Sequence, residues 1–411
     1  MPVLPKFNQF NGRHWETGSV SNALSYAGAR VPQTKQPYSE ALLLGISGGA
    51  AFGYFVFDYK GHDPHVALLS RNTFDPLQTL LERLAVPQEL FQTVDPKKGE
   101  RNLIEVLESG RPAIVWADAF SLPYNTPVAD QAMWGMLPIL VYGYEAGKVY
   151  IADRSGKPLT ASVDELARAR GRVKKDKFRV LVLGSPDPKK LPGAIQQGIT
   201  QCIELFTEPP PKGSRDNFGF AAYQKWANML TNTRNPQSWE RLLPPGSRMY
   251  AALAGSEYQP GAFGWARTFP SNQVDDRRLY ADFLDEAALI LGKPAVKPAG
   301  EMFRASSAAW RRLAEALLPD EVPLFKETRQ LLLRRRDLFI DKGEAVPKER
   351  KAASARLAEI RASIDKKFPL SPAGAAALRA QLAAQVLKIS EIERQAVELL
   401  QAAVEWPRPR S

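Results

Sequence analysis

The chain has 411 residues, 44% of them hydrophobic, and a formal net charge of +11, so it is long enough for two or three domains that each bury a core. Its apolar runs are too short and too rich in glycine to cross a bilayer, and its N-terminus lacks a signal-peptide layout. We therefore expect a cytoplasmic protein without membrane contact. One cysteine and three histidines exclude intramolecular disulfides and leave little for metal sites, so we expect neither metal nor cofactor.

Residues 1–185 alternate between helical and strand patterns. A helix is expected at Thr17–Gly28, and a second begins at Ser39–Glu40 and ends at Gly48–Gly49. The later elements of this part are a strand at Phe52–Tyr59, helices at Asn72–Leu84 and Gly99–Ser109, a strand at Ala113–Ala117, a hairpin of Ile139–Tyr144 and Lys148–Ala152, a helix at Val163–Arg170 and a strand at Phe178–Leu183. This order predicts an α+β domain over 1–185.

A mainly helical domain is expected to follow at 186–320. Proline-rich linkers at Ser185–Pro192 and Glu208–Gly213 flank one helix, Gly193–Phe206. Amphipathic patterns then recur at Phe218–Thr231 and Arg278–Leu291.

The last part, 321–411, is rich in Ala, Leu, Glu, Lys and Arg. Its pattern predicts long helices at Leu324–Ile340, Pro347–Asp365 and Pro372–Val404, the last with apolar residues at three- and four-residue steps. We expect a helical hairpin or coiled-coil extension. It either packs against the chain's own body or mediates contact with a protein partner or a second copy through 321–405.

Short motifs run through residues 8–184 in a characteristic order. They are Gly12–Gly18 (GRHWETG), Tyr38–Glu40 (YSE), the glycine-rich Gly45–Gly53, Gly110–Pro112 (GRP), Leu122–Tyr124 (LPY), Val141–Tyr144 (VYGY), Tyr150–Arg154 (YIADR) and Glu165–Arg170 (ELARAR). In this order they resemble the N-terminal domain of the butirosin biosynthesis protein H family. The resemblance implies a papain-like fold, similar to bacteriocin-leader peptidases, followed by the family's uncharacterised helical domain.

The same resemblance implies an acyltransferase that takes its acyl group from an acyl carrier protein and uses a Cys–His–Asp site. Carried over to this chain, the nucleophile position falls on Trp15 and the base position on Leu137 or Pro138. Neither indole nor these apolar side chains can do the expected chemistry. Only the orienting carboxylate, Asp153, remains, and we interpret it as vestigial.

Neighbours of these positions are expected to line a pocket, namely His14, Glu16, Thr17, Asp118, Tyr124 and Tyr144. The hydroxyl of Ser19 or Thr17 could replace the nucleophile only with a base beside it. We interpret Cys202 as an inert, partly buried thiol because its neighbours are apolar. Pro64 prevents a helical pair of His62 and His65, which we interpret as loop residues and not as metal ligands.

These features favour a catalytically inactive member of an acyltransferase-like family, acting as a binding or scaffold protein through its helical C-terminal region. One alternative is an active acyl or aminoacyl transferase, or an amide-forming enzyme, that relies on proximity and on Asp153 as base. A second is a basic adaptor that uses Arg168–Arg179 and Arg334–Arg336 to bind nucleic acid or an acidic protein. Nucleic acid is the less favoured partner, because no nucleic-acid motif accompanies the charge.

Overall fold

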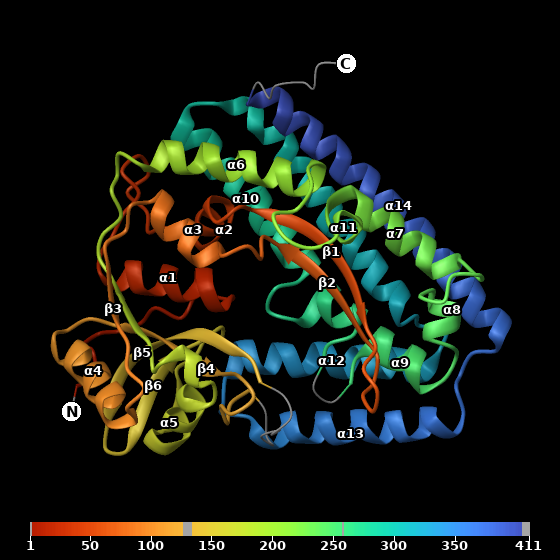
Figure 1. The fold of residues 1–411 in the computed structure, drawn as a ribbon, viewed down its shortest axis with the longest axis horizontal. Helices are drawn as coiled ribbons and strands as arrows, with labels where there is room; N and C mark the ends of the chain where they lie inside the picture. Colours follow the sequence, from red (N-terminus) through yellow and green to blue (C-terminus); the bar gives the residue numbers. More distant parts are fainter. Residues whose placement is uncertain (1, 126–133, 257–258, 405–411) are drawn as a thin grey trace. The chain divides into compact units, whose positions relative to one another are not determined.

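The computed structural model describes residues 2–125, 134–256 and 259–404. The described chain forms two compact units, and each combines separate stretches of sequence (Figure 1). The first unit contains Met1–Leu43, Leu77–Leu191 and Asp337–Lys351, and the second contains Leu44–Pro76, Pro192–Arg336 and Ala352–Ser411. The domain boundaries that we expect at residues 185 and 320 divide the sequence into consecutive segments, whereas the two units are groups of residues in contact. These boundaries therefore stay predictions.

The first unit is built on an antiparallel sheet with the strand order β3-β8-β4-β5-β6-β7 among its described residues. The strands are β3 (Gln88–Phe91), β4 (Ala113–Asp118), β5 (Met136–Glu145), β6 (Lys148–Ala152), β7 (Leu159–Ser162) and β8 (Val180–Leu183). The helices are α1 (Trp15–Tyr26), α3 (Pro76–Arg83), α4 (Pro96–Glu108) and α5 (Val163–Gly171), with the start of α2 (Glu40–Ile46). Helix α1 packs against β5, whose central residues Ile139, Leu140 and Val141 are buried.

The predicted hairpin of β5 and β6 is confirmed. Val141 pairs with Ile151 and Glu145 with Lys148. Ala146 and Gly147 form the turn with φ angles of +51° and +78°, the left-handed conformation that a tight two-residue hairpin turn requires. The expected helix α5 is confirmed too, with Ser162 as its N-cap.

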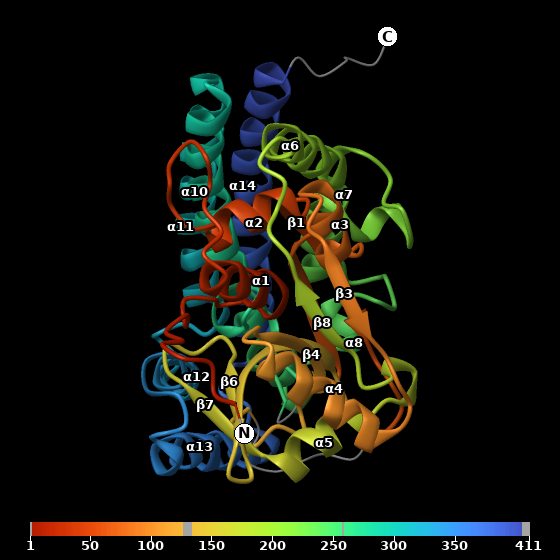
Figure 2. The same ribbon diagram turned by 90° about the vertical axis from the view of Figure 1, so that its left-hand side faces the viewer.

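The second unit is mainly helical and contains one hairpin, β1 (Ala50–Phe57) with β2 (His65–Arg71). Its helices are α6 (Leu191–Thr207), α7 (Gly219–Thr231), α8 (Trp239–Leu242), α9 (Ser247–Ala254), α10 (Gln273–Leu291), α11 (Lys297–Leu317) and α14 (Pro372–Ala403). Helix α11 packs against both α10 and α14 (Figure 1 and Figure 2). Stacked aromatic rings fill the core of this unit. The ring centroids of Phe52 and Tyr223 lie 3.7 Å apart, and those of Trp226 and Trp310 lie 6.0 Å apart.

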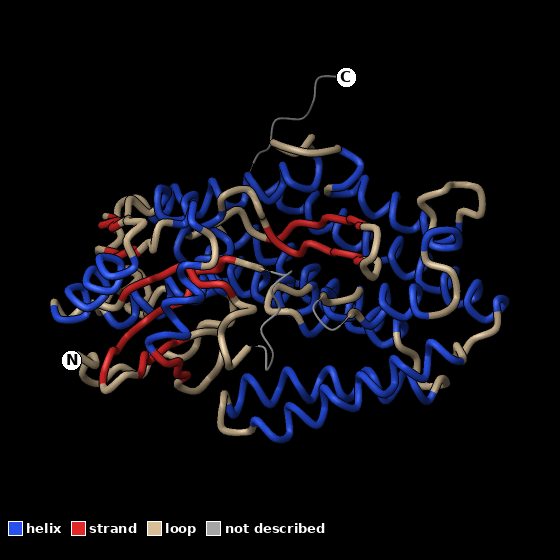
Figure 3. Tube along the Cα trace, turned by 60° about the horizontal axis from the view of Figure 1, so that its bottom comes forward, coloured by secondary structure: helices blue, strands red, loops and turns tan. Residues whose placement is uncertain are grey.

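Two long helices, α12 (Pro323–Lys342) and α13 (Pro347–Lys366), run side by side as a helical hairpin (Figure 3). An ion pair of 2.7 Å joins Glu327 of α12 to Arg356 of α13. The long helices expected after residue 321 are therefore present, while residues 405–411 of the predicted extension lie outside the described chain. Among the described residues, no helix is both long and apolar enough to cross a membrane.

Candidate functional site

Trp15 is the first residue of α1, the position at which the family resemblance places a nucleophile. His14 is the N-cap, and its Nδ1 accepts a hydrogen bond of 3.4 Å from the backbone N–H of Glu16. The helix starts two residues earlier than its apolar pattern suggested. Only 8% of Trp15 is exposed, so the indole is packed inside the first unit.

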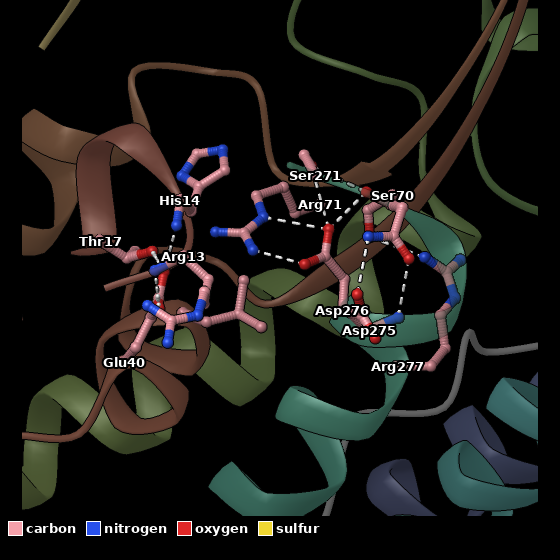
Figure 4. Close-up of polar contacts among 12 residues, drawn as sticks. Arg13, His14, Thr17, Glu40, Ser70, Arg71, Ser271, Asp275, Asp276 and Arg277 are labelled. Atoms are coloured by element: carbon pink, nitrogen blue, oxygen red, sulfur yellow. Dashed lines mark hydrogen bonds and ion pairs between the residues drawn. The ribbon is translucent and has the colours of Figure 1, made fainter. Parts of the chain in front are cut away.

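A carboxylate from α2 holds the start of α1 (Figure 4). Glu40 accepts hydrogen bonds from the backbone N–H groups of Arg13 at 2.7 Å and His14 at 2.9 Å, and from the hydroxyl of Thr17 at 3.0 Å. A negative charge at a helix N-terminus is stabilising. From the sequence we assigned Glu40 only to the start of a helix, although the YSE motif was a signal for it.

Arg154 connects Trp15 with Asp153. Its guanidinium carbon lies 4.4 Å from the centroid of the Trp15 ring, a cation–π distance. The same group donates to both oxygens of Asp153, at 2.7 and 2.8 Å. Tyr124 adds a hydrogen bond of 3.1 Å to this carboxylate, and burial, with the nearby Asp153 charge, raises the pKa of Tyr124 well above its usual value. The Asp153 carboxylate is therefore bound on both oxygens by groups that remain hydrogen-bond donors.

The residues that the resemblance assigns to the base position, Leu137 or Pro138, lie in β5 beside α1. The hydroxyl of Ser19, one turn after Trp15, donates to the backbone carbonyl of Pro138 at 3.4 Å. Leu137 pairs with Ala117 across β4 and β5. The geometry thus puts this part of β5 next to the first helix, but the side chains there offer no atom that can accept a proton.

A segment from the C-terminal part of the chain belongs to the same unit, and we call Asp337–Lys351 the strap. Phe339 of the strap stacks with Tyr124 at a centroid distance of 6.4 Å and an interplanar angle of 19°. The guanidinium carbons of Arg154 and Arg350 each lie 5.2 Å from the Phe339 ring. The group around Trp15 thus includes a side chain that comes 185 residues after Arg154 in the sequence.

Hydrogen bonds fix the strap to the residues that follow Asp153. The backbone carbonyl of Ile340 accepts from the N–H of Gly156 at 2.7 Å. Glu344 accepts from the N–H and the hydroxyl of Thr160, at 3.0 and 2.8 Å. The sequence contains no signal for these contacts, because a long helical pattern does not specify its partner.

Two predicted pocket residues make their hydrogen bonds elsewhere. Asp118 is fully buried and accepts from the hydroxyl of Ser121 at 2.5 Å and the N–H of Gly135 at 2.8 Å, so it joins a residue just after β4 to the residue just before β5. Tyr144 donates to Glu100 of α4, and burial together with this carboxylate raises its pKa. The structure therefore groups Trp15 with Asp153 and Tyr124, and gives Asp118 and Tyr144 structural partners of their own.

Within the described ranges, no group of three or more His, Cys, Asp or Glu residues is placed to hold a metal ion. His65 is the first residue of β2, which corrects our interpretation of it as a loop residue, and its ring stacks near Phe57 at 5.9 Å. Burial lowers its pKa to about 4, so it is neutral at pH 7.

The second unit contains a fully buried ion pair between Arg277 of α10 and Glu393 of α14, 2.8 Å apart. Glu393 also accepts hydrogen bonds from the hydroxyls of Ser306 at 2.5 Å and Tyr223 at 2.7 Å, and from the indole N–H of Trp310 at 3.3 Å. A second buried pair, Arg71 with Asp276 at 2.5 Å, appears in Figure 4. Because every oxygen has donors, these charges are satisfied inside the core.

Cys202 lies in α6 and is fully buried, with its thiol 3.2 Å from the carbonyl of Ala50. Burial raises its pKa to about 12. The thiol stays protonated below that pH, so at pH 8 roughly one molecule in ten thousand carries the reactive thiolate.

We expect no reaction of Cys202 in the native protein with dithiobis(nitrobenzoate) at pH 8, and one reactive thiol per chain after unfolding in guanidinium. Full labelling of native protein within minutes would contradict the buried placement.

The described chain is thus an α+β protein whose first helix begins at a buried tryptophan and packs on an antiparallel sheet, with a helical C-terminal region. Residues 14–154 match the family described as butirosin biosynthesis protein H, N-terminal, and residues 277–323 match a domain of unknown function (DUF4872). Residues 14–154 therefore form a domain of the butirosin biosynthesis protein H N-terminal family, and the predicted resemblance is confirmed over this range. No curated protein matches the chain.

The two family matches include residues of the two side-chain clusters described above, the one around Trp15 and the one around Glu393. The first begins at His14 and ends at Arg154, so it spans the stacked Trp15–Arg154 pair from end to end. The second begins at Arg277 and includes Ser306 and Trp310, which both bind Glu393. Glu393 itself comes from the extension beyond the matched residues.

Proposed function

We propose that this protein is a catalytically inactive relative of biosynthetic acyltransferases and works by binding, as a scaffold or adaptor. One observation carries the proposal. The guanidinium of Arg154 stacks 4.4 Å from Trp15 and holds both oxygens of Asp153. An indole occupies the nucleophile position, and the remaining carboxylate is neutralised by an adjacent cation.

The proposal includes a papain-like fold for the first unit. It is supported by α1, which starts at the nucleophile position and packs against β5, and by the position of Asp153 directly after β6. In this arrangement the base would stand near Leu137 and Pro138, where no proton acceptor is available. A proximity mechanism with Asp153 as base is less well supported, because Arg154 and Tyr124 already bind its carboxylate.

We also propose a protein partner for the helical C-terminal region. The apolar face of α14, which suggested self-association, packs against α7 and α11 of its own unit, so a partner of 321–405 would need another face. Helix α13 exposes Lys348 and Lys351, and such charges attract an acidic surface. An acyl carrier protein is the acidic partner that the family resemblance implies, and the cytoplasm is the expected location.

The first test is thioester turnover by the full-length protein. We expect S-acetyl-N-acetylcysteamine to leave no acetyl mass on the protein and to be hydrolysed no faster than in buffer, because neither a nucleophile nor a base is present. Mass spectrometry measures acetylation of the protein, and the release of free thiol measures hydrolysis of the thioester. The Cys202→Ala variant is the control for adventitious acylation. Turnover that persists in Cys202→Ala and falls in Asp153→Asn would favour the active alternative instead.

A further inference from the structure

The second unit contains a cavity of about 280 Å³, formed by the end of α6, the start of α7 and the last turns of α14. Its apolar wall is aromatic. The rings of Phe206 and Phe220 lie 5.2 Å apart at their centroids, and Phe206 is only 2% exposed. Phe206 therefore supports Phe220 from inside the unit, and an apolar group entering the cavity would meet the part-exposed rings of Phe218 and Phe220.

Charged side chains of both signs line the same cavity. They are Arg215 and Arg394, and Glu208 and Glu398. The guanidinium carbon of Arg394 lies 4.6 Å from the Phe220 ring, which places the cation at the edge of the aromatic wall. The ion pair of Arg394 with Glu391 is long, at 3.9 Å, and exposed, so it is weak and leaves the guanidinium able to bind another anion.

We infer that this cavity binds a small zwitterion with an apolar side chain, that is, a free aromatic or large aliphatic amino acid. The carboxylate would be bound by Arg394 and Arg215, the ammonium group by Glu398 and Glu208, and the side chain would lie against Phe218 and Phe220. The volume equals that of roughly nine water molecules, which is room for a single amino acid. The inference is independent of the proposed function, because the cavity belongs to the second unit.

Three probes test the charge pattern on the full-length protein by calorimetric titration and saturation-transfer NMR. We expect saturable binding of L-phenylalanine. Phenylacetate lacks the ammonium group and phenethylamine lacks the carboxylate, so each is expected to bind at least tenfold more weakly, as the loss of a charge-assisted hydrogen bond implies. Absence of L-phenylalanine binding, or equal binding of phenylacetate, would overturn the inference.

Variants then locate the site. Arg394→Gln and Glu398→Gln are each expected to weaken L-phenylalanine binding at least tenfold, whereas Arg312→Gln, an exposed position on α11, leaves it unchanged. The thermal midpoint of each variant checks that the unit remains folded. If Arg394→Gln is folded and binds like the wild type, the cavity is not the site.

Discussion

Replacing Glu393 by alanine is expected to destabilise the second unit by about 3–5 kcal/mol, the usual cost of leaving one member of a buried ion pair alone. The substitution removes the anion from Arg277, whose exposed fraction is 0%. It also leaves donors of Ser306, Tyr223 and Trp310 without their acceptor. For a unit of this size the thermal midpoint should fall by roughly 6–20 °C, measured by calorimetry or circular dichroism.

The same helix provides a matched control. Glu391 is an exposed glutamate of α14 with a weak ion pair of 3.9 Å to Arg394, so Glu391→Ala should change stability by less than about 0.5 kcal/mol. The paired change of Arg277→Met with Glu393→Met removes both charges and should recover part of the loss. Equal midpoints for Glu393→Ala and Glu391→Ala would show that the buried pair does not hold α14 in place.

Elements with a strong periodic pattern could be predicted from the sequence. The β5–β6 hairpin was predictable because two apolar runs flank a short turn at Glu145–Gly147, and α14 because its apolar residues recur at helical steps. Strands β3 and β7 were missed because each has only four residues, too few for a hydrophobic alternation to stand out from its surroundings, and β3 is also largely exposed.

The candidate site was predictable only in part. The resemblance pointed to Trp15 and Asp153, and the structure connects these two positions through Arg154. The role of Arg154 depends on its φ angle of +57° after β6, a conformation that arginine rarely adopts and that no sequence pattern indicates. Phe339 was also missed, since contacts between distant segments leave no local signal.

Replacing Glu344 by alanine is expected to release the strap and to speed its cleavage by trypsin roughly ten- to a hundredfold. The glutamate is the acceptor of both bonds from Thr160, and hydrogen bonds to a charged group contribute about 1.5–3 kcal/mol, while cleavage of a transiently opened segment follows its opening free energy. Trypsin sites lie in this part of the strap at Lys342, Lys348, Arg350 and Lys351. Glu349→Ala, an exposed position in the same strap, is the control and should be cleaved like the wild type.

The Glu344→Ala variant also distinguishes a domain that lacks catalytic residues from an active domain that the strap inhibits. In the released variant Phe339 no longer covers Arg154, so a thioester could approach Asp153. We nevertheless expect no acyl transfer in Glu344→Ala, because Trp15 and Leu137 still supply neither nucleophile nor base. Acyl transfer that appears only in the released variant would mean that the strap, and not the residues at the catalytic positions, keeps the domain inactive.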